Sequence, residues 1–118
     1  MPHVTLDSRI DLHELSKYFR PIFQKSPLIK ISNIFVDKMG HTALLPTVVI
    51  DDYHQEFFIQ ISTTNEKTTI RLCVETDPVK TDNVKLSLVL LYRHVSEIFP
   101  SLNILHSNLF EFIEMEAK

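Results

Sequence analysis

The second residue of the chain, Pro2, has the position that offers the clearest chemistry. Methionine before a small residue such as proline is usually removed after synthesis, and its removal would leave Pro2 as a free secondary amine. Burial in an apolar pocket disfavours the cationic form of an amine, so the pKa of the amine falls toward neutrality. A base whose pKa lies near the working pH is suited to move a proton beside a carbonyl group. The alternative is that Pro2 follows the start codon and has no chemical role.

Length and composition limit the classes of protein to which the chain can belong. With 118 residues, of which 44% are hydrophobic and 23% charged, the chain can form one domain with its own core. The net charge of −3, without a basic stripe, argues against nucleic acid as a partner. No apolar run approaches the roughly 20 residues that span a bilayer, and no signal peptide is expected. Cys73 is the only cysteine, so we expect no disulfide within the chain and a cytoplasmic location.

Apolar periodicity predicts alternating strands and helices. Asp11, followed by Glu14 at capping-box spacing, predicts the start of the first helix, and Pro46 points to a strand that is irregular or at an edge. Gly40 is the only glycine, which excludes glycine-rich phosphate loops and nucleophile elbows. The expected strands cover residues 3–7, 28–36, 44–50, 56–62, 68–76 and 109–115, and the expected helices cover residues 11–23 and 82–99.

The order of these elements predicts an α+β fold. Two β-α-β units, with extra strands between them, would form one sheet with both helices on one face, in a single domain over residues 1–118. The other face of the sheet still carries apolar side chains, and the expected strand 109–115 is apolar on both faces. Such surfaces predict burial in an oligomer.

A strand that begins at Pro2 and is followed by paired β-α-β units resembles the tautomerase superfamily, and within it the 5-carboxymethyl-2-hydroxymuconate isomerase family. The shared features are the opening Met1-Pro2-His3, the Pro27-Leu28 pair before a strand that ends at Val36-Asp37, and Phe110-Glu111-Phe112 after the second helix. The resemblance implies a homotrimeric keto–enol tautomerase, an isomerase, in which Pro2 acts as general base and then general acid on an unsaturated 2-hydroxy or keto acid. It implies no metal and no organic cofactor.

The resemblance also indicates where the substrate carboxylates would bind. The main substrate-binding arginine of the family falls at Lys30, and a second family arginine has only Lys80 as a loose counterpart. Lys30, together with Arg71, would hold a carboxylate and stabilise the dienolate. Lysine lacks the planar two-pronged geometry of arginine. This departure motivates a second hypothesis, a non-catalytic oligomeric domain of the same fold that binds a ligand or a partner.

The other reactive side chains have structural interpretations that we prefer. The six histidines contain no pair at the helical i, i+4 spacing of a metal site, so we expect them to be surface or structural residues. Asp51-Asp52 fits a polar hairpin turn better than a metal site, and Cys73 has no identifiable base, so we expect it to be packed. For Arg71, pairing with Glu75 is the alternative to binding a substrate anion.

Overall fold

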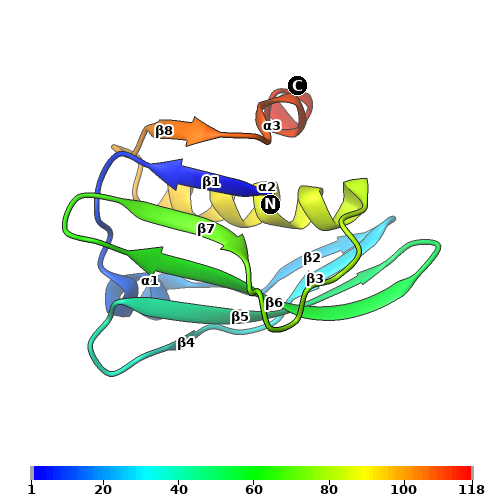
Figure 1. Cartoon of the computed structure of the whole chain (residues 1–118), viewed down its shortest axis with the longest axis horizontal. Coiled ribbons are helices and arrows are strands. Elements are labelled where there is room, and N and C mark those ends of the chain that lie inside the picture. Colours follow the sequence, from blue (N-terminus) through cyan, green and yellow to red (C-terminus); the bar gives the residue numbers. More distant parts are fainter. Residues whose placement is uncertain (1, 118) are drawn as a thin grey trace.

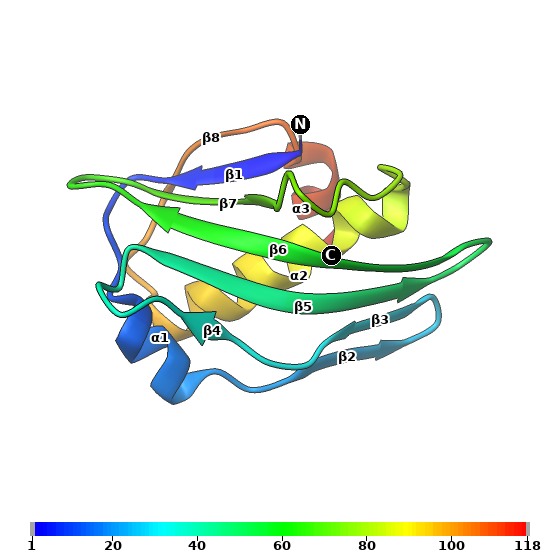
Figure 2. The same cartoon turned by 60° about the horizontal axis from the view of Figure 1, so that its bottom comes forward.

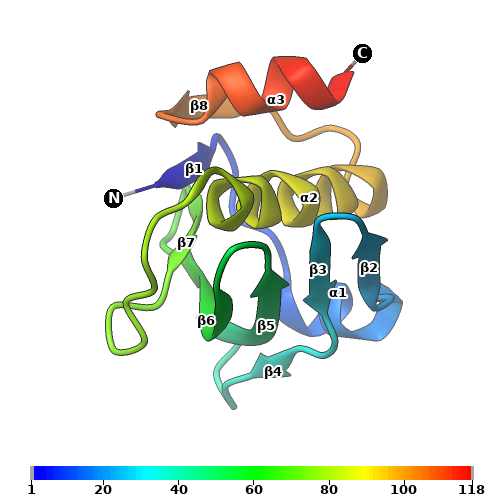
Figure 3. The same ribbon diagram turned by 90° about the vertical axis from the view of Figure 1, so that its right-hand side faces the viewer.

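A curled antiparallel sheet holds one long helix against its concave face (Figure 1, Figure 3). The computed structural model describes the backbone of residues 2–117 and the side chains of residues 2–113. The elements, in chain order, are β1 (His3–Leu6), α1 (Leu12–Tyr18), β2 (Ile22–Lys25), β3 (Leu28–Ile31), β4 (Phe35–Val36), β5 (Thr42–Ile50), β6 (His54–Thr63), β7 (Thr68–Leu72), α2 (Asp82–Ile98), β8 (Ile104–Ser107) and α3 (Phe110–Ala117).

The strand order corrects the predicted fold class. The sheet runs β2-β3-β5-β6-β7-β1-β8, β4 pairs with β5, and every neighbouring pair in the described residues is antiparallel. A β-α-β unit requires parallel strands, but β1 and β2, which flank α1, are separated in the sheet by β3, β5, β6 and β7. The prediction of two β-α-β units with both helices on one face is therefore wrong. Short turns at residues 51–53 and 64–67 instead join adjacent strands as hairpins.

Two segments adopt a different secondary structure from the one that their sequence predicts. The first helix ends at Tyr18, and the apolar residues Ile22 and Phe23 belong to β2. Pro21, whose ring would clash in a helix interior, lies between the two elements. Residues 109–115, expected as a strand, lie mostly in α3. Leu109 and Ile113 are four residues apart, a helical spacing that competed with the apparent alternation.

Other local predictions are confirmed. Asp11 caps α1, because its carboxylate accepts hydrogen bonds from the backbone N–H groups of His13 and Glu14 at 3.0 and 3.2 Å. The expected helix at 82–99 is α2, capped by Thr81. None of the helices in the described part of the chain is long and apolar enough to cross a membrane.

The core lies between α2 and the inner face of the sheet. The face of α2 that points to the sheet is apolar and fully buried at Val84, Leu88, Leu91 and Val95. The sheet contributes every second residue of each strand, as the two-residue period of a strand requires. On β5 these inward residues are Ala43, Leu45, Thr47 and Val49, all at most 2% exposed. The residues between them point to the outer face.

Pro46 explains why the strand beside β5 is interrupted. Proline has no backbone N–H and cannot donate to a sheet ladder. β3 pairs with β5 up to Thr47, and β4 resumes the pairing at Leu44, so neither strand pairs with Pro46 itself. The Pro46 carbonyl still accepts a hydrogen bond from the Ser32 N–H at 3.3 Å. The predicted irregularity thus falls on the neighbouring strand.

Candidate functional site

Pro2 is buried and lines a surface pocket of about 240 Å³. The pocket lies where the start of β1 meets the N-terminal end of α2 and the segment before α3. Its other lining residues are Lys80, Lys85, Asn108 and Leu109. Met1, on whose removal the predicted amine depends, lies outside the described residues. The structure therefore places Pro2 beside two lysines, of which the sequence indicated only Lys80.

The charges of these two lysines are partly engaged. The Lys80 ammonium donates to the Asp77 carboxylate at 2.6 Å, and the Lys85 ammonium lies 5.8 Å from the centroid of the Phe112 ring. An exposed ion pair of this kind is worth about 1 kcal/mol at most, so an incoming anion can compete for Lys80. Chemically, the pocket could bind a small carboxylate beside Pro2.

Arg71 lies on the strand next to β1, close to Pro2 in the sheet register, but its side chain is on the other face of the sheet. It stands opposite His3 in the β1–β7 register, and cross-strand partners share a face. Pro2, one residue earlier, lies with Lys85 on the side of α2. The Nε atom of Arg71 is buried and has no hydrogen-bond partner. Within one chain, the Arg71 side chain and Pro2 thus belong to different surfaces.

Cys73 and Glu75 form a hydrogen-bonded pair near Arg71. The Cys73 thiol donates to the Glu75 carboxylate at 3.1 Å, and this hydrogen bond is the main cause of the lowered pKa of Glu75, to which the nearby Arg71 charge adds. Burial, followed by this same hydrogen bond, raises the pKa of the Cys73 thiol. A protonated, buried thiol is a poor nucleophile, which agrees with the expectation that Cys73 is a packing residue.

Lys30 lies far from the Pro2 pocket. It points outward from β3, and β5, β6 and β7 separate β3 from β1 in the sheet. Four strand spacings of about 4.8 Å place the two strands roughly 19 Å apart. The structure does not bring Lys30 and Pro2 together within one chain. Among the described residues, Lys30 makes no side-chain hydrogen bond or ion pair.

Two of the six histidines lie beside each other in the structure. His3 and His106 lie side by side on β1 and β8, with 3.3 Å between Nε2 and Nδ1. No group of three metal-binding side chains occurs in the part of the chain that the structure describes.

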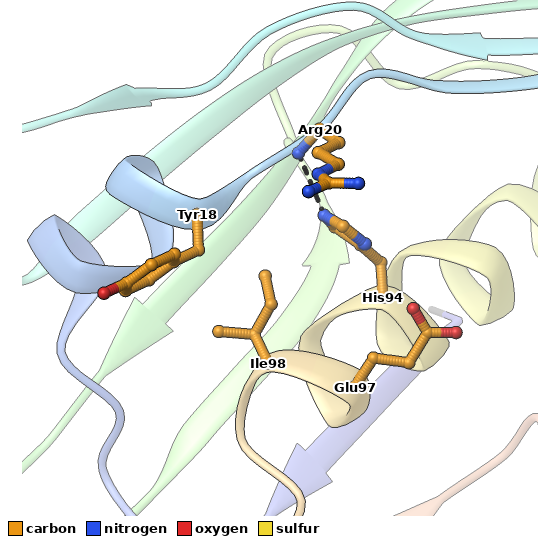
Figure 4. Close-up of a pocket in the computed structure, with 5 residues that line it drawn as sticks. All are labelled: Tyr18, Arg20, His94, Glu97 and Ile98. Atoms are coloured by element: carbon orange, nitrogen blue, oxygen red, sulfur yellow. Dashed lines mark hydrogen bonds between the residues drawn. The ribbon is translucent and has the colours of Figure 1, made fainter.

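A second pocket, of about 380 Å³, lies between the exit of α1 and the C-terminal half of α2, and its lining residues are Tyr18, Arg20, His94, Glu97 and Ile98 (Figure 4). The backbone N–H of Arg20 donates to His94 Nε2 at 3.1 Å, so this nitrogen carries no proton. Burial lowers the pKa of His94; the Glu97 charge opposes this effect and the Arg20 charge adds to it. Because the lone pair of Nε2 is already engaged, His94 fastens the chain after α1 to α2 and is not a free general base.

The outer face of the sheet carries an apolar surface that none of the described elements covers. In Figure 2, β5 and β6 lie in front of α2, and no helix of the described chain covers them from the viewer's side. We call the four outward residues of β5 the outer β5 stripe: Leu44, Pro46, Val48 and Ile50. Further outward apolar residues lie on β2, β3, β4 and β6, beside the stripe or one strand farther out: Phe23, Leu28, Phe35 and Phe58. Phe23 and Phe35 are 61% and 58% exposed.

The sequence carried a signal for this surface. Residues 43–50 form a run of apolar residues interrupted only by Thr47. Such runs are typical of strands covered on both faces, whereas a strand with one solvated face alternates. The expectation of an apolar outer face was based on the whole sheet and on residues 109–115, and it did not single out β5.

A comparison with known protein families, with curated proteins and with solved structures finds no match to this chain.

Proposed function

We propose that this protein is a non-catalytic binding domain that docks another protein surface on the outer β5 stripe. The observation that carries the proposal is the two-sided apolar character of β5. Its inward residues are covered by the core, while the outward residues Leu44, Pro46 and Val48 are only half-buried and Ile50 is 38% exposed. Contiguous exposed apolar surface on a small domain marks an interaction site more often than it marks a tolerated defect.

The shape of the outer face supports a protein partner over a small molecule. The outer β5 stripe spans three intervals of about 6.8 Å, so it is roughly 20 Å long. It lies on a sheet surface, and none of the pockets found among the described residues is lined by a stripe residue, whereas small-molecule sites are concave and enclose most of their ligand. The pocket at Pro2 and the pocket at His94 lie elsewhere on the molecule, away from the stripe.

Cysteine accessibility inside living cells tests this proposal. The variant Val48→Cys places a small thiol in the stripe, and Asn65→Cys places a matched thiol in the exposed β6–β7 turn. Relative to Asn65→Cys, Val48→Cys should be labelled by a membrane-permeant maleimide much more slowly in cells than in dilute purified protein, a comparison that corrects for the half-buried position of Val48. After unfolding, both should react at the same rate, and the wild-type chain gives the background from buried Cys73. The same ratio of the two labelling rates in cells and in dilute purified protein would show that nothing covers the stripe and would remove the proposal.

A second candidate function is proton transfer by Pro2 on a keto or enol acid. Its support is the pocket in which Pro2 lies beside Lys80 and Lys85, whose ammonium groups would attract a substrate carboxylate. This candidate rests on the pocket and on loss of Met1, not on the order of the elements. Turnover of a phenylpyruvate-type substrate should be lost in Pro2→Ala and weakened mainly in KM in Lys85→Ala. Unchanged turnover in Pro2→Ala, or retention of Met1 in the intact mass, would eliminate it.

A further inference from the structure

The charges beside the outer β5 stripe suggest which protein surface it binds. In the strand register, Lys30 on β3 pairs with Val48 on β5, and Val48 pairs with Glu56 on β6. A cation and an anion therefore flank the middle of the stripe, each about 4.8 Å from Val48 and on opposite sides. Cross-strand partners share a face, so both charges point outward with the stripe. Both side chains are exposed.

This arrangement is complementary to itself. When two copies pack face to face around a two-fold axis parallel to β5, the β3 side of one copy lies over the β6 side of the other. Lys30 of each copy then faces Glu56 of the other, and the stripe residues face their own counterparts. A two-fold contact of this kind is isologous, the commonest type in homo-oligomers. An axis across β5 would instead place Lys30 against Lys30, which like charges disfavour.

The local partners of the two charges leave them available. Lys30 makes no side-chain ion pair or hydrogen bond among the described residues. The only ion pair of Glu56 there is a 3.8 Å contact with His54, in which both side chains are more than 60% exposed. An exposed contact of this length contributes little. Forming the reciprocal Lys30–Glu56 pairs would therefore break no strong interaction.

The rows on either side of the charged row fit the same axis. Phe35 and Gln60 both pair with Leu44, from opposite sides, so each faces the other across the two-fold axis. Phe58 pairs with Pro46, and it would face the interruption between β3 and β4, where no strand pairs with Pro46. An axis along β5 also keeps the strands of the two sheets aligned, as they are in most face-to-face sheet packings.

From these observations we infer that the occupant of the outer β5 stripe is a second copy of this chain, held by two reciprocal Lys30–Glu56 pairs. This inference rests on the proposed function, because it names the partner of that surface. Because the outer face is convex, the contact is centred on β3, β5 and β6; three strands of about 4.8 Å spacing and a stripe of roughly 20 Å give about 300 Å² per copy in plan. Counted over both copies, this lies below the range of stable specific interfaces, so the dimer should be weak and exchange quickly.

Sedimentation with a charge reversal tests the inference. The wild-type chain should dimerise as its concentration rises to about 1 mM, a range chosen because interfaces of this size are weak. Lys30→Glu and Glu56→Lys should each weaken dimerisation about tenfold, which corresponds to about 1.4 kcal/mol. The double variant should recover to within about threefold of the wild type, because it restores both pairs with reversed sign. Lys67→Glu and Glu66→Lys, in the exposed β6–β7 turn, make the same changes in net charge and should have no effect.

Each other outcome has a defined meaning. A wild-type chain that stays monomeric at about 1 mM overturns the inference; if Val48→Cys is nevertheless protected in cells, the proposed function stands with a different protein as partner. A trimer, or a dimer in which the double variant is no stronger than the single ones, overturns the two-fold arrangement. If Val48→Cys is labelled freely in cells while the purified chain dimerises as described, the self-association stands and the cellular function fails.

Discussion

The inner and outer faces of β5 have nearly the same composition and opposite surroundings. Leu45 and Val49 on the inner face are fully buried by α2 and the rest of the core, whereas Leu44 and Val48 on the outer face are only half-buried. Folding of the single chain accounts for the inner face, since burial of such side chains is the main driving force for folding. It does not account for the outer face, which the proposed partner would cover. The comparison of the two faces therefore separates the residues that stabilise the single chain from those assigned to binding by the proposal.

The largest effect is expected from two adjacent leucines on opposite faces. Leu45→Ala should lower the free energy of unfolding by about 2–5 kcal/mol, because it leaves a cavity in the core. Leu44→Ala should lower it by about 1 kcal/mol, since its side chain is only half-buried and its removal leaves no enclosed cavity. Urea unfolding of dilute protein measures both. Equal losses would mean that the outer face is already covered within the monomer, contrary to the comparison.

A second matched pair lies on β7. Thr68 is fully buried on the inner face, where its hydroxyl donates to the Ser8 carbonyl at 2.8 Å and accepts from the Ile10 N–H at 3.1 Å. Thr68→Val should cost about 1–3 kcal/mol, because it leaves both backbone groups unpaired. Thr69→Val, on the outer face, loses only a 3.5 Å hydroxyl contact with Thr5 and should cost about 1 kcal/mol or less. A Thr69 effect as large as that of Thr68 would contradict the assignment of faces.

The smallest effect concerns pH at the contact between α2 and the chain after α1. The folded pKa of His94 lies below the ordinary value of 6.5, so the unfolded chain takes up a proton at higher pH than the folded chain does. The stability that depends on neutral His94 is complete above about pH 6.5 and is lost as the pH falls through the lower folded pKa. His94→Gln keeps an acceptor for Arg20 N–H without titrating. Unfolding measured across this range should show a shallower pH dependence in the variant, and an unchanged dependence would contradict this role.

Much of the local structure could be predicted from the sequence, and the sheet topology could not. The cap at Asp11 and the periodicity of α2 depend on neighbouring residues, so they were found. Whether two strands run parallel or antiparallel depends on where a distant segment returns, and a helix between two strands suggested a parallel return. β1 instead pairs with β7 and β8, which lie more than 60 residues away in sequence at their paired positions.

The candidate sites show the same limit. Pro2 and Lys80 do share a pocket, but Lys30 was assigned to that site through a resemblance, and the structure places it with Glu56 beside the outer β5 stripe. The pairing of Lys30 with Glu56 across Val48 depends on the register of two ladders. No local pattern in the sequence encodes that register. The apolar run at 43–50 is visible in the sequence. Which of its residues face away from the core follows only from the position of α2 in the fold.

Short-range cross-linking between two variants tests the central claim most directly. Lys30→Cys and Glu56→Cys chains, one of them labelled with a heavy isotope, are mixed and treated with a bismaleimide of about 10 Å reach, the usual spacing of packed sheets. A mixed dimer keeps one intact Lys30–Glu56 pair, whereas a dimer of either variant alone keeps none. The account predicts that mass spectrometry finds the mixed product well above the share that random pairing gives. A random mixture, an excess of either single-variant product or no cross-link at all would contradict it.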